Sequence, residues 1–234
     1  MKRFFSADTS SVHEEEAYHA FKVLRCKPGE QIEIITGKGQ LYSAVIDTIS
    51  KDKIELSDIT LLKEQFSNPN KLSVAISPTK NPARFEWFLE KASEIGIDHI
   101  FPIITERTEK TTLKKERLEN ILLSAAKQSK QLFIPTLHPI QSLSNLLSNQ
   151  HIGTSAHRFI AHCENEQQAF FGKVYSKGTQ ALLLIGPEGD FSPGEITTAV
   201  NNNYQAVSLG SSTLRVETAG VVACTIVNSI NFER

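Results

Sequence analysis

Hydrophobic and polar residues alternate in three short segments of the first third of the chain, as they do in half-buried β-strands. The segments cover residues 31–36, 41–50 and 53–62, and short polar turns separate them. Strands at this spacing predict a small antiparallel β-barrel. Ahead of them, residues 13–26 carry apolar residues at helical spacing, so we expect a short helix whose buried side holds Ala17, Ala20, Phe21 and Leu24.

From residue 71 onward the pattern changes to strands that alternate with helices. Expected strands cover residues 72–77, 99–105, 155–163, 181–186 and 205–210, and expected helices cover 83–96, 113–130 and 217–232. This alternation predicts a mostly parallel sheet with helices on both faces. The polar residues 67–70, which include Pro69, are the best linker candidate, and they place the two expected domains at 1–70 and 71–234.

The last expected helix, residues 217–232, is apolar on nearly every side. A helix without a polar face is buried. A homodimer interface and an interior position in the sheet domain both explain this pattern.

Composition narrows the class of protein. The 234 residues are 40% hydrophobic and 22% charged, with a net charge of −1, which excludes a disordered or collagen-like chain. No apolar run reaches the roughly 18 residues of a membrane span, and no secretory signal follows Met1, so we expect a cytoplasmic protein. The three cysteines lie far apart and the histidines lack ligand spacing, so we expect neither a metal site nor a disulfide framework.

Charge is a weak indicator of function here. Residues 71–135 contain eleven basic and eight acidic residues, a mild positive surplus. Proteins that hold nucleic acid through phosphate contacts alone are usually far more basic. The charge by itself therefore favours a solvated helix face over an RNA-binding surface.

Two glycine-marked turns carry the candidate chemistry. In residues 184–195 a strand runs into Gly-Pro-Glu-Gly and then into a helix start, where Ser192 and Glu195 can form a capping box. Residues 209–220 also follow a strand and precede a helix, with Arg215 and Glu217 at the mouth. Either turn alone could be a plain tight turn, and the charged pair could be a surface ion pair. Because ligands bind beyond the carboxyl ends of strands in open α/β sheets, the two turns together favour a shared pocket.

The combination of GPEGxFSxxE at 186–195 and LGxxxLRxETA at 209–219 resembles the 16S rRNA uracil-N3 methyltransferases of the RsmE type, which belong to the SPOUT class. The resemblance covers nearly the whole chain and includes MKRFF at the start and EWFLEKASEIGIDHIFPIITERT in the middle. It implies a PUA-like antiparallel β-barrel followed by an α/β trefoil-knot domain with a mostly parallel sheet. It also implies S-adenosylmethionine as methyl donor, 16S rRNA of the small ribosomal subunit as partner, and a homodimer.

The resemblance assigns roles to residues of this chain. Arg215 is expected to stabilise the uracil oxygens, and Glu217 to act as an orienting group or a weak base. The residues expected to hold the donor are Leu184, Ile185, Gly186, Pro187, Glu188, Gly189, Leu209, Gly210, Ser211, Thr213 and Leu214. The residues expected to contact RNA in the barrel are Lys2, Arg3, Arg25 and Lys27.

The chain departs from the family pattern at three places. Asp190 stands where a second glycine is usual, Ser212 and Thr213 stand where a basic residue commonly precedes Leu-Arg, and Gln131 lies where an arginine is expected. These departures motivate one alternative, a non-catalytic RNA-binding protein that keeps the fold. A second alternative is a SPOUT enzyme that acts on transfer RNA or on another base.

Overall fold

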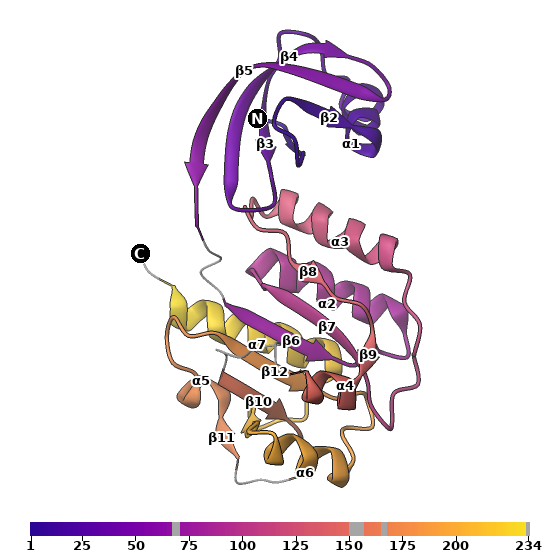
Figure 1. Ribbon diagram of the computed structural model, residues 1–234, viewed down its shortest axis with the longest axis vertical. Coiled ribbons are helices and arrows are strands. Elements are labelled where there is room, and N and C mark those ends of the chain that lie inside the picture. The colour runs from indigo at the N-terminus through magenta and orange to yellow at the C-terminus, as the bar shows by residue number, and fades with distance from the viewer. Residues whose placement is uncertain (67–70, 150–156, 165–167, 233–234) are drawn as a thin grey trace. The chain divides into compact units, whose positions relative to one another are not determined.

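The computed structural model describes residues 1–66, 71–149, 157–164 and 168–232, and two compact units make up the chain (Figure 1). One unit combines Met1–Asn68 with Leu123–Ile134, and the other combines Pro69–Leu122 with Pro135–Arg234. The expected linker at 67–70, together with Ser155 and Ala156 of an expected strand, lies outside the described residues. The mixed α/β class is confirmed, with an antiparallel curled sheet first and a parallel sheet after it.

The first unit is a five-stranded sheet in the order β1-β3-β4-β5-β2. Its strands are β1 (Arg3–Phe5), β2 (Ser11–His13), β3 (Gln31–Ile35), β4 (Gln40–Ile49) and β5 (Lys53–Glu64). The three long strands match the predicted ones and pair antiparallel, whereas β1 pairs parallel with β3. Register shifts between β4 and β5 allow the sheet to curl over its apolar core. The strands β1 and β2 were not predicted, because three residues are too few to show an alternating pattern.

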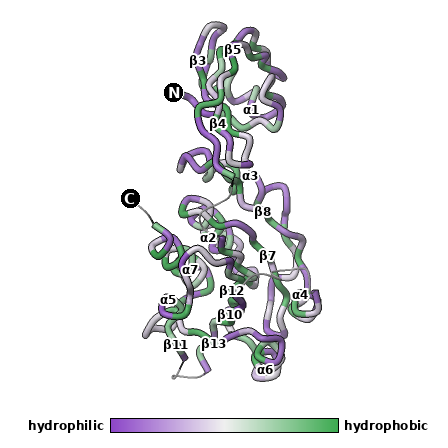
Figure 2. Tube along the Cα trace, turned by 60° about the vertical axis from the view of Figure 1, so that its left-hand side comes forward, coloured by the Kyte–Doolittle hydropathy of each residue, from purple (hydrophilic) through white to green (hydrophobic). Residues whose placement is uncertain are grey.

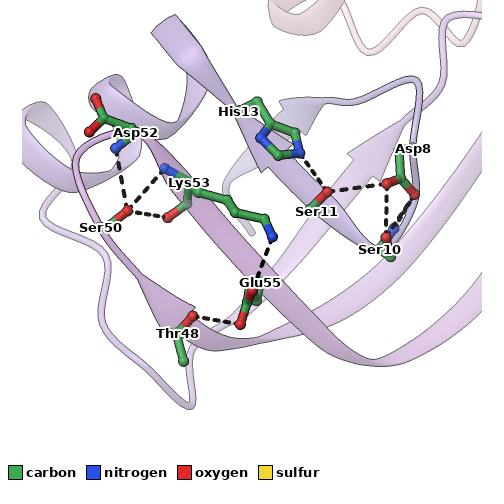
Figure 3. A network of polar contacts seen from close by, with 9 residues as sticks. All are labelled: Asp8, Ser10, Ser11, His13, Thr48, Ser50, Asp52, Lys53 and Glu55. Carbon is green, nitrogen blue, oxygen red and sulfur yellow. Dashed lines mark hydrogen bonds and ion pairs between the residues drawn. The ribbon is translucent and has the colours of Figure 1, made fainter.

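Polar side chains near β2 and near the start of β5 form two separate sets of contacts in the first unit (Figure 3). The Asp8 carboxylate accepts hydrogen bonds from the Ser10 backbone and hydroxyl at 2.9 and 2.8 Å, and these bonds lower the pKa of Asp8. The Ser11 hydroxyl lies 2.7 Å from Nε2 of His13. On β5, Lys53 Nζ lies 3.0 Å from Glu55. The Ser11 hydroxyl, which is buried, also donates a hydrogen bond to Asp8 at 3.2 Å, so these contacts satisfy a polar group that solvent does not reach.

The predicted helix at 13–26 is shorter than expected and changes type. It begins as α1 (Glu14–Tyr18) and continues as a π-helical turn, η1 (His19–Val23). Ala17 and Ala20 are buried as predicted, but the placement of Phe21 in the buried stripe is wrong, since its side chain is 37% exposed. The π-helical turn leaves Phe21, Lys22 and Val23 exposed, whereas Leu24 packs against the core again.

The segment Leu123–Ile134 belongs to the first unit through contacts that the sequence pattern does not show. Leu132 packs with Ile35 and Leu41 in a small apolar cluster. Its carbonyl oxygen accepts a hydrogen bond from Gly39 N at 2.9 Å. Gln131, the position where the family has an arginine, lies in this segment.

The second unit contains a sheet in the order β11-β13-β10-β12-β6-β7-β8, and every pair in it is parallel. Its strands are β6 (Leu72–Ile76), β7 (His99–Ile104), β8 (Thr136–Leu137), β10 (His157–Ala161), β11 (Ala169–Phe170), β12 (Ala181–Ile185) and β13 (Gln205–Ser208), with β9 (Gln141–Ser142) paired to β7. In this order β10 lies between β12 and β13, so the chain crosses over β10 on its way from β12 to β13. The carboxyl ends of β10, β12 and β13 therefore meet at one edge.

Helices cover both faces of this sheet, as predicted. They are α2 (Pro82–Ile95), α4 (Leu143–Ser148), α5 (Phe171–Val174), α6 (Pro193–Asn201) and α7 (Val216–Asn231), together with the part of α3 (Lys115–Gln128) that ends at Leu122. Strand β12 shows the two-sided burial: Leu183 and Ile185 pack in the cluster with α2 and α7, and Leu182 and Leu184 pack in the cluster with α4 and α6. In Figure 2 hydrophobic positions run through these strands.

The last helix packs inside the unit. The contact side of α7 lies against α2, and Ala219, Gly220, Ala223 and Cys224 are buried. Burial raises the pKa of the Cys224 thiol to about 12, so this cysteine is an inert core residue. The interior position explains the apolar character of this side, and the homodimer stays a prediction.

We expect the free energy of unfolding to fall as the pH drops from about 6.5 to 4, because of His138. Its ring stacks on Phe101 at 3.9 Å between centroids and lies 3.1 Å from Nδ1 of His99. Burial, and then the neighbouring His99, lower the pKa of His138 to about 4. The unfolded state therefore takes up a proton before the folded state does, and stability present above pH 6.5 is lost on acidification.

The half-exposed side chain limits this effect to about 1–2 kcal/mol. Urea unfolding of the wild type and of His138→Phe between pH 7 and 4 measures it. The phenylalanine keeps the stacking on Phe101 and removes the titrating group. Parallel pH profiles of the two proteins would exclude His138 as the cause.

Candidate functional site

A cleft of about 660 Å³ opens at the carboxyl ends of β10, β12 and β13. The structure brings the two glycine-marked turns together there, and most of the predicted donor-binding residues line the cleft. These are Ile185, Gly186, Pro187, Glu188, Leu209, Gly210, Ser211, Thr213 and Leu214.

Two of the predicted donor-binding residues do not line the cleft. Leu184 is fully buried in the opposite apolar cluster, because neighbouring residues of a strand point to opposite faces. Gly189 lies on the outer side of its turn, where its carbonyl oxygen accepts a hydrogen bond from Arg107 Nη1 at 2.6 Å. Both residues thus support the wall of the cleft from behind.

The turn after β12 is held by contacts from neighbouring segments. A Cβ atom on Gly186 would lie 3.1 Å from the backbone nitrogen and the ring of Phe191, so only glycine fits without a shift. The Glu188 carboxylate accepts a hydrogen bond from Lys80 N at 3.0 Å. The predicted capping box is present, since Ser192 and Glu195 exchange side-chain and backbone hydrogen bonds at the start of α6.

Asp190, which stands in place of the family glycine, keeps the backbone conformation that a glycine would adopt. Its φ is 60°, in the left-handed region that aspartate tolerates better than most residues. One carboxylate oxygen accepts a hydrogen bond from Cys163 N at 2.8 Å, and the other accepts one from Phe191 N at 2.8 Å. The side chain therefore joins the turn after β12 to the turn after β10.

A third wall of the cleft was missed in the sequence. Ala161, His162, Cys163 and Gln168 line the cleft after β10. Partial burial lowers the pKa of His162, and partial burial followed by the neighbouring Asp190 carboxylate raises the pKa of the Cys163 thiol. We expected His162 within a strand, but β10 ends at Ala161. The signal that could have found this wall is a third strand end at the same edge of the sheet.

The two predicted catalytic residues lie in different surroundings. Arg215 is exposed at the N-terminal end of α7 and lines the cleft. Glu217 lies in the first turn of the same helix, is only 8% exposed, and is 3.8 Å from Nε of Arg84. The cleft is lined by Arg215 and not by Glu217. Ser212 and Thr213 also line it, so this turn has no basic side chain ahead of Leu214.

The four basic residues predicted to contact RNA lie in the first unit, and two of them are engaged. Lys2 forms an ion pair with Glu30 at 2.7 Å, and Arg3 forms one with Glu33 at 2.7 Å. Arg25 and Lys27 have exposed side chains, and neither forms an ion pair within the part of the chain that the structure describes.

Within residues 1–66, 71–149, 157–164 and 168–232, no group of three or more histidine, cysteine, aspartate or glutamate side chains is arranged to hold a metal ion. Among the same residues, no helix combines the length and the apolar character that crossing a membrane requires.

Comparisons with known proteins agree with this geometry. The family described as RNA methyltransferase domain matches residues 66–228, and the RNA methyltransferase PUA domain matches residues 13–59. The Ribosomal RNA small subunit methyltransferase E of Bacillus subtilis (strain 168) is 28% identical over 95% of this chain and 90% of its own length.

Solved structures show the same fold over the full length. The probable rRNA-methyltransferase from Porphyromonas gingivalis is 34% identical, with a TM-score of 0.89 over 99% of this chain and 98% of that one. The Ribosomal RNA small subunit methyltransferase E from Neisseria gonorrhoeae, solved bound to S-adenosyl methionine, is 25% identical, with a TM-score of 0.83 over 98% of this chain and 97% of that one. The chain therefore belongs to the RsmE-type family of RNA methyltransferases and carries the PUA domain of that family ahead of the methyltransferase domain.

Proposed function

We propose that this enzyme transfers a methyl group from S-adenosylmethionine to N3 of a uracil in the 16S rRNA of the small ribosomal subunit. The observation that carries the proposal is the convergence of the turns after β12 and β13 on one cleft, with Arg215 beside it. The names of the relatives support the substrate, and the donor bound in the Neisseria gonorrhoeae structure supports the cofactor.

The cleft fits the donor in size and chemistry. Its volume of about 660 Å³ is that of a small-molecule site. Glycines in both turns expose backbone N–H and C=O groups, which can bind the polar groups of a nucleoside. We assign donor binding to Ile185–Glu188, Leu209–Ser211, Thr213 and Leu214, with Leu184 and Gly189 holding the wall from behind.

The donor supplies a methyl group on a sulfonium sulfur, which becomes a neutral thioether when the methyl leaves. Uracil N3 carries a proton in neutral uridine, and the loss of that proton to solvent water leaves negative charge on N3 and the uracil oxygens. N3 then forms its bond to the methyl carbon as the carbon–sulfur bond breaks. The Arg215 guanidinium, at the mouth of the cleft, stabilises this charge and helps to orient the base.

We assign Glu217 the role of an orienting residue. It is buried at the start of α7, two residues after Arg215, and its nearest cation is Arg84. A carboxylate in this position can fix the first turn of α7 and thereby the backbone at Arg215. The alternative role of weak base needs contact with the uracil, and the lining of the cleft does not favour it.

We assign RNA binding to the barrel at residues 1–70 and methyl transfer to residues 71–234. In the barrel, Lys2, Arg3, Arg25 and Lys27 are the proposed phosphate contacts. We also infer that the enzyme acts as a homodimer, as the family resemblance implies, and in the cytoplasm, where its ribosomal substrate is.

The double variant Arg25→Ala/Lys27→Ala is expected to weaken binding to small ribosomal subunits by about tenfold at 100 mM salt and to reduce the salt dependence. Both side chains are exposed and available to phosphates. The matched control is Lys51→Ala/Lys53→Ala, which removes the same charge from the turn before β5 and from the first residue of β5, and it should change binding by less than about twofold. Filter binding at several salt concentrations measures the effect. Equal losses in the two double variants would show only a general charge effect.

Two experiments together test the proposed function. Incubation of the purified enzyme with labelled S-adenosylmethionine and small ribosomal subunits should produce N3-methyluridine in 16S rRNA. Base analysis of ribosomal RNA from cells that lack the protein should show the loss of that nucleotide. A protein that binds RNA but does not bind S-adenosylmethionine would support the non-catalytic alternative. A modified base found only in transfer RNA would support the other enzyme class.

A further inference from the structure

We propose that Asp190 makes the cleft selective for a cationic sulfonium donor over the neutral thioether product. The inference rests on the proposed function, because it takes S-adenosylmethionine as the donor. It concerns Asp190, which this chain carries in place of a glycine. The property at issue is the discrimination between donor and product.

The position of Asp190 allows such a role. The residue lines the cleft at the end of the turn after β12 and is half-buried. Its carboxylate is held in place by the N–H groups of Cys163 and Phe191, each at 2.8 Å. Both bonds come from neutral donors, so they orient the carboxylate without cancelling its charge.

The other charged side chains at the cleft leave a role for the negative charge of Asp190. Arg215 lines the same cleft and repels a sulfonium cation. Glu188 is exposed at the rim, where its carboxylate accepts a hydrogen bond from Lys80 N. On the outer side of this turn, the cation Arg107 donates a hydrogen bond to the carbonyl oxygen of Gly189. Among the described residues that line the cleft, Asp190 is thus the half-buried carboxylate, with a charge opposite to that of Arg215.

The chemistry of the reaction separates charge selectivity from other roles. Methyl transfer converts the sulfonium sulfur into a neutral thioether and leaves the amino and carboxylate groups of the molecule unchanged. A carboxylate near the sulfur therefore stabilises the donor and not the product. A carboxylate near the amino group, or one that only braces the turn, stabilises both equally. Coulomb energy falls with the inverse of distance. The Asp190 carboxylate can therefore act on the sulfonium from within the same cleft without touching it.

The test compares the Kd values of S-adenosylmethionine and S-adenosylhomocysteine, measured by calorimetry with the full-length protein. Asp190→Asn keeps an oxygen that can accept the Cys163 hydrogen bond, tolerates the positive φ and removes the charge. We expect it to weaken donor binding about fivefold to tenfold and to change product binding less than about twofold. Asp190→Gly, which adopts this backbone conformation without cost, should give the same change in the ratio of the two Kd values.

The matched control is Glu109→Gln, which removes a carboxylate that pairs with Lys80 at 2.8 Å and does not line the cleft. It should leave the ratio of the two Kd values within about twofold of the wild-type ratio. Equal weakening of donor and product in the Asp190 variants, or the same change in ratio in Glu109→Gln, overturns the inference while the proposed function stands. A wild-type protein that binds neither ligand contradicts the proposed function itself, and the inference with it.

Discussion

Replacement of Arg215 by alanine is expected to lower methyl transfer to small ribosomal subunits by about 100-fold to 1000-fold. The guanidinium lies at the mouth of the cleft, at the start of α7, where it can meet negative charge on the target base. The charge develops only as the N3 proton leaves, so the loss should appear in kcat. Donor binding should not weaken, since backbone groups make most of the proposed donor contacts and the lost guanidinium repels the sulfonium charge.

Single-turnover kinetics with saturating donor, together with calorimetry of donor binding, measure the two effects separately. Arg117→Ala is the matched control, because Arg117 is an exposed arginine of α3 that pairs with Glu86. Its activity should stay within about twofold of the wild type, as expected for an exposed ion pair. Full turnover in Arg215→Ala would remove this residue from the reaction. In Glu217→Gln, a rate unchanged across pH would leave Glu217 without a role as base.

Replacement of Gly220 by alanine is expected to lower the free energy of unfolding by about 2 kcal/mol, although alanine is the better helix former by about 1 kcal/mol. The added Cβ atom would lie 2.4 Å from the ring of Phe88, which is fully buried in α2. A buried aromatic ring cannot move aside as a flexible side chain can. The helices α2 and α7 would have to separate, and the steric cost exceeds the gain in helix propensity.

Thermal unfolding should show a melting temperature lower by about 4–8 °C for Gly220→Ala. Gly194→Ala is the matched control, since a Cβ atom there meets nothing within 4 Å and the residue lies in the first turn of α6. It should leave the stability unchanged or raise it by up to about 0.5 kcal/mol. A Gly220→Ala protein as stable as the wild type would show that the close packing of the two helices is not required.

Local features of the chain were predictable because their causes are local. The start of α6 follows from Ser192 and Glu195, which satisfy the free N–H groups of the first turn. The central strands follow from uninterrupted apolar runs, which only a sheet covered on both faces can bury. The short strands β1 and β2 were missed, because their pairing depends on partners far along the chain.

The class of fold and the two glycine-marked turns follow from the amino-acid sequence, and the resemblance of their motifs adds the family and the donor. Which side chains share the cleft becomes visible in the folded chain alone. It placed His162 and Cys163 in the lining, Leu184 in the core and Glu217 behind Arg215. It also joined Leu123–Ile134 to the first unit. The physical reason is that turn and cap signals act over a few residues, whereas strand order and side-chain direction depend on packing between segments distant in the chain.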